Sequence, residues 1–163
     1  MSKNRSVATK ITNIALKGFV QSDGGTGTGP DVDLLTLNTD FTGYVDYLLF
    51  VSGHTAISED ADTSNTTRLR IILRDVGTGN EHIICGSRQG LGSNVNAGAG
   101  NSIAYMSTSG YFALTSAYTT NNCTIRLNGG IDSGAFHWGD QSSYTNFDGE
   151  DLGASLYYIL YKQ

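Results

Sequence analysis

The chain has little proline, little cysteine and little charge. Proline occurs once and cysteine twice among 163 residues, and charged side chains make up 15% of the chain, against about 25% in an average soluble domain. The first residues mix basic and polar side chains and do not resemble a secretory signal. We therefore expect Cys85 and Cys123 to be reduced thiols. A chain of this length buries about 70% of its unfolded surface, so its core needs no disulfide or metal.

Motifs for catalysis, cofactors and membranes are also absent. No run of 18 apolar residues occurs, which predicts no membrane span. The glycine-rich segment 23–30 lacks the Lys and the Ser or Thr of a phosphate loop, and no G-x-S-x-G sequence occurs. His54, His82 and His137 are far apart and lie in no metal-binding motif. The acidic run 59–62 offers oxygen ligands to calcium but lacks the glycine and distal glutamate of an EF-hand, which favours a solvated loop. We expect neither a cofactor nor enzymatic activity.

The residues that are abundant favour β-structure. Glycine occurs 21 times, and serine, threonine and asparagine replace the missing charged residues. This composition suits short strands joined by tight polar turns better than it suits long helices. Strand candidates follow one another at fairly regular spacing, which predicts an antiparallel β-sandwich or barrel. The expected strands are 7–16, 32–37, 43–52, 67–76, 81–86, 102–106, 111–115, 123–128 and 154–161.

Positive charge is concentrated at the N-terminus. The first 20 residues contain Lys3, Arg5, Lys10 and Lys17 and no acidic residue, whereas the other 143 residues contain six basic and fifteen acidic residues. Such a basic segment is typical of a docking arm for a negatively charged partner, and the alternative is a solvated terminus. We expect residues 1–30 to form an N-terminal arm with a glycine-rich connector, and residues 31–163 to form the β-sandwich body. The acidic body does not favour nucleic acid as a partner.

One expected strand, 67–76, has an apolar face and a charged face. The apolar face carries Leu69, Ile71 and Leu73, and the opposite face carries Arg68, Arg70 and Arg74. Because successive side chains of a strand point to opposite faces, this pattern predicts that one face is buried and the other is in water. The arginines are expected to pair with acidic residues across strands. The alternative is that they receive an acidic surface of a partner.

Two other expected strands, 43–52 and 154–161, are apolar on both faces. In an antiparallel sandwich one face of each strand normally meets water, so the second apolar face needs a cover. That cover is either a partner subunit or a segment of the same chain. Tyrosine is typical of subunit interfaces because it combines a large ring with a polar tip. The expected interface residues are Tyr44, Tyr47, Phe50, Tyr157, Tyr158, Ile159 and Tyr161.

A third feature is a cluster of aromatic residues after the strand 123–128. Aromatic rings beside carboxylate and amide groups can stack on a sugar and bind its hydroxyl groups. The residues of this candidate glycan or receptor site are Phe136, His137, Trp138, Asp140 and Tyr144. Two other interpretations are a buried plug that closes one end of the sandwich and a subunit contact.

The last third of the chain resembles a known family of jelly rolls. The strand 122–127, the stretch 143–149 and the apolar strand 155–161 are similar to the close of a tumour-necrosis-factor or C1q-type domain, in which a Thr-x-Phe-x-Gly sequence precedes the last strand. Thr145, Phe147 and Gly149 match that spacing, whereas Glu150 and Asp151 lengthen the following link and depart from the pattern. The resemblance implies a jelly-roll sandwich whose last strand lies along the axis of a homotrimer.

Jelly rolls of this kind occur in bacteriophage virions as capsid decoration (cement) proteins, head fibres and tail-fibre tips. We therefore expect a virion structural protein, made in the host cytoplasm, that binds the major capsid protein or another virion protein and decorates or cements the capsid surface. The alternative is a carbohydrate-binding or receptor-binding module of a viral fibre or tail tip.

Overall fold

Almost the whole of the described chain is β-strand. The computed structural model of the protein describes residues 14–59, 65–93, 102–139 and 153–162. These residues form eleven strands and one short 3-10 helix, η1 (Ser116–Tyr118). The strands are β1 (Ile14–Ser22), β2 (Gly25–Thr28), β3 (Val32–Asp40), β4 (Tyr47–Glu59), β5 (Thr66–Asp75), β6 (Glu81–Gly90), β7 (Gly92–Ser93), β8 (Ser102–Ala113), β9 (Asn122–Ile131), β10 (Ala135–Trp138) and β11 (Ala154–Lys162).

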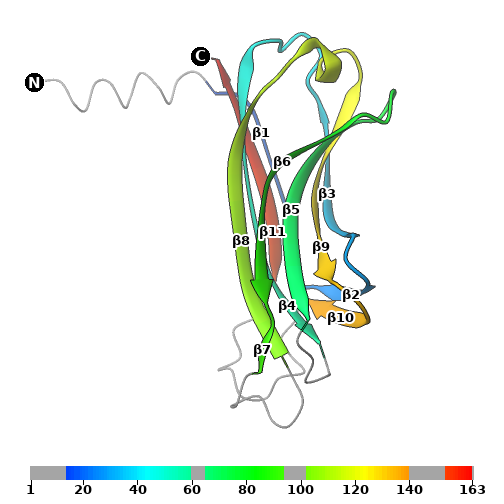
Figure 1. Cartoon of the computed structure of the whole chain (residues 1–163). Coiled ribbons are helices and arrows are strands. Elements are labelled where there is room, and N and C mark those ends of the chain that lie inside the picture. The colour runs from blue at the N-terminus through cyan, green and yellow to red at the C-terminus, as the bar shows by residue number, and fades with distance from the viewer. Residues whose placement is uncertain (1–13, 60–64, 94–101, 140–152, 163) are drawn as a thin grey trace, which may run out of the picture.

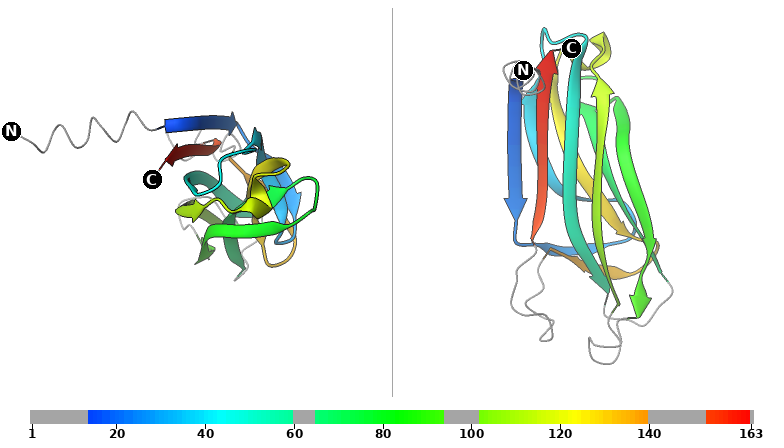
Figure 2. Two further views of the ribbon diagram at one scale, coloured as in Figure 1. Left: turned by 90° about the horizontal axis from the view of Figure 1, so that it is seen from above. Right: turned by 90° about the vertical axis from the view of Figure 1, so that its left-hand side faces the viewer.

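The strands form two antiparallel sheets that pack face to face (Figure 1). In sheet A the long strands lie in the order β1-β11-β4-β8, as the right-hand view of Figure 2 shows face-on. β7 pairs with the outer edge of β8, and the short pair β10-β2 joins the end of β4. Sheet B has the order β3-β9-β5-β6. The expected all-β antiparallel sandwich is confirmed, and its eight long strands have the order of a jelly roll.

Alternation along the strands places the core between the sheets. In β5, Leu69, Ile71 and Leu73 are completely buried, as their spacing predicts. They meet inward-pointing residues of sheet A such as Leu49 of β4 and Leu156 of β11 in one continuous core. Both cysteines are free thiols.

The described part of the segment expected to be an N-terminal arm and connector, residues 14–30, belongs largely to the sandwich. β1 pairs with β11 along its whole length, because Leu16, Gly18 and Val20 point inward and extend the apolar face of the sheet. Farther on, β2 pairs with β10, with Gly25 opposite Trp138. Residue 30 is therefore not a boundary between arm and body. Lys3, Arg5 and Lys10 lie outside the described residues.

The pair β2-β10 lies across one end of the molecule and closes the sandwich there (Figure 1, lower right). Phe136 and Trp138 of β10 point into the core, where their exposures are 1% and 8%. This arrangement agrees with the interpretation of the aromatic cluster as a buried plug.

Candidate interaction surfaces

The outer surface of sheet A carries a cluster of large apolar side chains. The register of the strands aligns Ile159 of β11 with Phe50 of β4 and Phe50 with Tyr111 of β8. On the next rung, Phe19 of β1 lies opposite Tyr157 of β11. We name this surface the outer aromatic face, and its residues are Phe19, Phe50, Tyr111, Tyr157, Ile159 and Tyr161.

Three rings of the outer aromatic face are in contact, and two rings of the face are largely open to solvent. The ring centroid of Phe50 lies 5.0 Å from that of Tyr111 and 5.8 Å from that of Tyr157. Phe19 and Tyr111 are each 61% exposed. The pKa of Tyr161 is raised, mainly by its partial burial and to a smaller extent by the neighbouring phenol of Tyr111. A sheet that covers a core on one side usually presents polar residues on the other, and an exposed apolar patch of this kind marks a contact with another molecule.

The structure divides the expected interface residues into two groups. Phe50, Tyr157, Ile159 and Tyr161 lie on the outer aromatic face. Tyr158 instead points into the core, where its hydroxyl lies 3.0 Å from Oγ1 of Thr39.

Tyr44 and Tyr47 lie away from that face. They pack edge to face with centroids 5.1 Å apart where the chain enters β4, half-buried against the core. Tyr44, Tyr47 and Tyr158 therefore serve the interior of the protein. Phe19 and Tyr111 belong to the face although the sequence pattern did not mark them, because only the register of β1 and β8 brings them there.

The outer surface of sheet B is charged, and its arginines are paired with acidic residues as expected. Arg68 binds Asp132 with an Nη2–Oδ1 distance of 2.9 Å, and Arg126 binds Asp33 at 2.8 Å between Nη1 and Oδ2. Arg74 lies 3.7 Å from Oε1 of Glu81. The hydrogen bond from Arg68 lowers the pKa of Asp132. The two outer surfaces of the sandwich therefore differ in kind, one aromatic and one ionic.

The candidate glycan site is not assembled on the surface. Phe136 and Trp138 are in the core, so their ring faces are not available to stack on a sugar. His137 is half-buried on the same strand. Asp140 and Tyr144 lie outside the described residues, as do Thr145, Phe147 and Gly149.

Potential catalytic and metal-binding groups are few in the part of the chain that the structure describes. Ser155 Oγ lies 2.8 Å from Nδ1 of His54, on the outer side of sheet A. A catalytic triad also requires an acid that orients the histidine, and no described carboxylate hydrogen-bonds or pairs with His54. The described residues contain no cluster of His, Cys, Asp and Glu that could hold a metal ion. Of the acidic run 59–62, only Glu59 is described, and it is buried.

No described helix is long and apolar enough to cross a membrane. Neither a family model nor a curated protein matches the chain.

Proposed function

We propose that this protein is a virion structural protein that decorates or cements a capsid, and that it assembles as a homotrimer through the outer aromatic face. The observation that carries the proposal is the exposure of large aromatic side chains over a sheet whose other side is already filled by the core. Phe19 and Tyr111 expose most of their surface, although burying such a ring is worth roughly 1.5–3 kcal/mol. A surface of this kind gains stability by meeting a partner.

A second copy of the same chain suits this surface better than a charged partner does. Two central rows of side chains run across the four long strands of this face. They consist of tyrosine, phenylalanine, isoleucine and serine, and Lys17 is their one charged residue. Tyrosine and phenylalanine are enriched at the centre of protein interfaces, where charged residues are depleted. The last strand, β11, is flanked by β1 and β4 within this surface. That position agrees with the resemblance, which implies that the last strand lies along a trimer axis.

Docking to the capsid is assigned to the basic N-terminal residues Lys3, Arg5 and Lys10. Lys17, which the sequence grouped with them, lies opposite Ile159 on the outer aromatic face and is left out of the docking segment. β1 begins where β11 ends, since Ile14 lies opposite Tyr161 (Figure 1). In a trimer, three copies of residues 1–13 would therefore start from one end of the assembly. Linked binding segments raise the overall affinity for a multivalent surface well above that of one segment.

The test of docking is co-sedimentation with purified capsid shells that lack the protein. The deletion must stop at residue 13, because β1 starts at Ile14 and its removal would expose the edge of β11. We expect the full chain to sediment with shells, and the variant that lacks residues 1–13 to remain in the supernatant with an unchanged melting temperature. A full-length variant in which Lys3, Arg5 and Lys10 are replaced by Gln should behave like the deletion. Normal shell binding by both variants would refute the docking role.

A carbohydrate-binding module is supported less well. Its expected platform requires exposed rings, and Phe136 and Trp138 are buried. The substitution Trp138→Ala is therefore expected to destabilise the fold.

A further inference from the structure

The arginines of the body are gathered on the outer surface of sheet B. Five of the six basic residues after residue 20 are arginines. All five lie on this surface and pair with the carboxylates of Asp31, Asp33, Glu81 and Asp132. These arginines are Arg68, Arg70, Arg74, Arg88 and Arg126. The outer surface of sheet B thus gathers nearly all the basic side chains of an otherwise acidic body.

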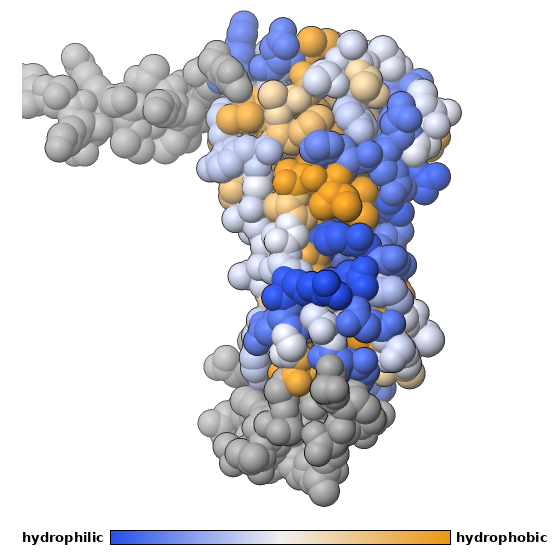
Figure 3. All heavy atoms as spheres, in the orientation of Figure 1, coloured by the Kyte–Doolittle hydropathy of each residue, from blue (hydrophilic) through white to orange (hydrophobic). Residues whose placement is uncertain are grey.

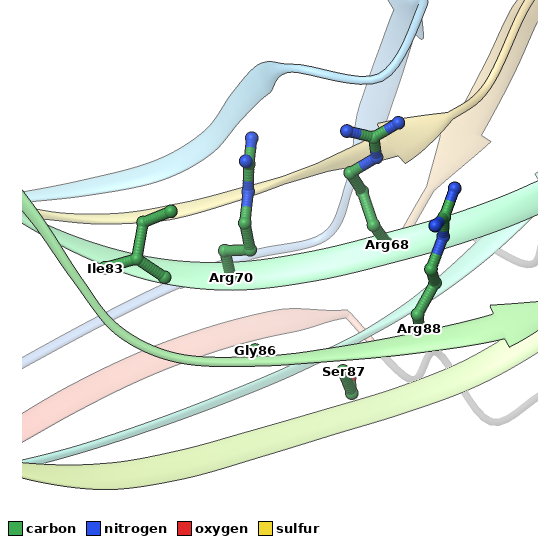
Figure 4. Close-up of a pocket in the computed structure, with 6 residues that line it drawn as sticks. All are labelled: Arg68, Arg70, Ile83, Gly86, Ser87 and Arg88. Atoms are coloured by element: carbon green, nitrogen blue, oxygen red, sulfur yellow. The ribbon is translucent and has the colours of Figure 1, made fainter.

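Three of these arginines surround an open hollow between β5 and β6 (Figure 4). The hollow has a volume of about 310 Å³. It exists because Arg70 lies opposite Gly86 in the β5–β6 register, and glycine has no side chain to fill the space. Figure 4 shows the guanidinium groups of Arg68, Arg70 and Arg88 on the same side of the two strands. Ile83, 52% exposed, lines the hollow from β6.

The arginines of the hollow have fewer acceptors than they could use. Arg68 and Arg88 are directly opposite each other, an arrangement of like charges that is unfavourable on a sheet. They share one carboxylate oxygen of Asp132, at 2.9 Å from Arg68 Nη2 and 3.3 Å from Arg88 Nη2. The Nε atoms of Arg68 and Arg70 are buried and have no hydrogen-bond partner. A buried donor without an acceptor is unfavourable, so an additional anion would be bound favourably.

We propose that this hollow binds carboxylate groups of an acidic segment on a partner protein. The planar fork of arginine matches the two oxygens of a carboxylate. The open shape suits a side chain that projects from a larger partner, because a free small molecule would gain little burial there. Apolar and strongly hydrophilic surfaces adjoin along β6 (Figure 3), so Ile83 offers a contact for an apolar residue beside the carboxylate. Nucleic acid fits less well, because Asp31 and Asp132 would repel a run of phosphates.

This site is separate from the outer aromatic face and does not depend on the proposed function. Its test uses the purified full-length chain labelled with ¹⁵N. A blocked peptide of six glutamates is titrated, and the Nε–Hε signals of the arginines are followed by NMR. We expect the signals of Arg68 and Arg70 to move and saturate. The signal of Arg74, which pairs with Glu81 outside the hollow, should stay in place.

Two variants and a control test the geometry. Arg70→Lys keeps the charge and removes the fork, and it should weaken peptide binding at least tenfold. Gly86→Ala changes no charge but adds a β-carbon 3.1 Å from Cγ of Arg70, so it should also weaken binding. Arg74→Lys, the matched control, should bind as the unmodified chain does. Melting curves verify that each variant is folded.

Three results would overturn the proposal. The first is a titration in which no arginine Nε–Hε signal moves. The second is an equal loss of binding for Arg74→Lys and Arg70→Lys, which would mean that only net charge matters. The third is tighter binding of a six-nucleotide single-stranded DNA than of the glutamate peptide, which would assign the surface to nucleic acid.

Discussion

The carboxylate of Asp75 is buried at the end of β5, where the chain turns toward β6. It accepts a hydrogen bond from the backbone N–H of Thr78 at 2.8 Å and from Nδ2 of Asn121 at 3.1 Å. The hydrogen bond from Thr78 makes the larger contribution and the one from Asn121 the smaller, and together they hold the pKa of Asp75 below its ordinary value. The pKa of Asp75 is thus lower in the folded protein than in the unfolded chain, where it is about 3.9. The charged carboxylate therefore stabilises the fold at any pH above about 3.9, and this contribution is lost as the pH falls through the folded-state pKa.

The substitution Asp75→Asn should therefore lower the melting temperature at pH 7, since a neutral amide is a weaker acceptor than a carboxylate and has an NH2 group in place of one of the two acceptor oxygens. The difference from the unmodified chain should shrink as the pH falls below about 4. Thermal melts between pH 7 and pH 3 measure it, and Asp23→Asn at an exposed position is the control. A difference that stays constant over this range would contradict the role of the charged form.

The thiol of Cys123 should be inert in the folded protein. Cys123 is 1% exposed, and burial, followed by the charges of Asp75 and Asp40, raises its pKa to about 11. The thiolate is the reactive form of cysteine, so almost none is present at pH 8. We expect iodoacetamide to label Cys123 only after unfolding in urea, as judged by mass spectrometry of peptides. Rapid labelling of the native protein at this position would show that the β5–β9 end of the core opens.

At the scale of single elements, the packing of β1 on β11 depends on a glycine. Gly18 lies opposite Tyr158, and a β-carbon at Gly18 would overlap the tyrosine ring. The ring cannot easily move, because it also packs edge to face on Phe41 and its hydroxyl contacts Thr39.

Gly18→Ala should therefore destabilise the protein by about 1–3 kcal/mol, which is the usual cost of overpacking a core. Gly90→Ala is the matched control, because nothing lies within 4 Å of the added β-carbon there. Urea denaturation of both variants gives the two free energies of unfolding. Equal effects at the two positions would mean that Tyr158 adjusts without cost.

The same elements show how far the sequence could predict the fold. Alternation located β3, β5, β9 and β11, because their apolar residues are spaced by two. It did not locate β2, whose glycines have the composition of a turn and form a strand only beside the rings of β10. It also divided 102–115 into two strands at Gly110. β8 continues through that residue because Cys85 of β6 packs against it, a contact between distant parts of the chain.

The candidate surfaces were predictable to a similar degree. In β11 the sequence separated Leu156, Tyr158 and Leu160 from Tyr157, Ile159 and Tyr161. With both faces apolar, it could not tell which of them meets the core. The register between strands decides this, as it also decides that Gly86 faces Arg70 and leaves a hollow. Register depends on pairing between strands that are far apart in the sequence, and the spacing of residues within one strand does not specify it.

At the scale of the whole molecule, assembly should depend on the outer aromatic face. Tyr111→Glu would place a charge within the proposed contact, where burial of an unpaired carboxylate is unfavourable. We expect this variant to be monomeric and folded. Val76→Glu is the control, because Val76 is similarly exposed, at 56%, but lies in the turn after β5. Size-exclusion chromatography compares the two, and an unchanged elution of Tyr111→Glu would remove the face from the interface.

The homotrimer is tested most directly by the mass of the full chain in solution, measured by light scattering at micromolar concentration. The chain itself has a mass of 17.3 kDa. We expect three times this mass, because three outer aromatic faces would be buried together. A particle with the mass of one chain across the whole concentration range would contradict the homotrimer.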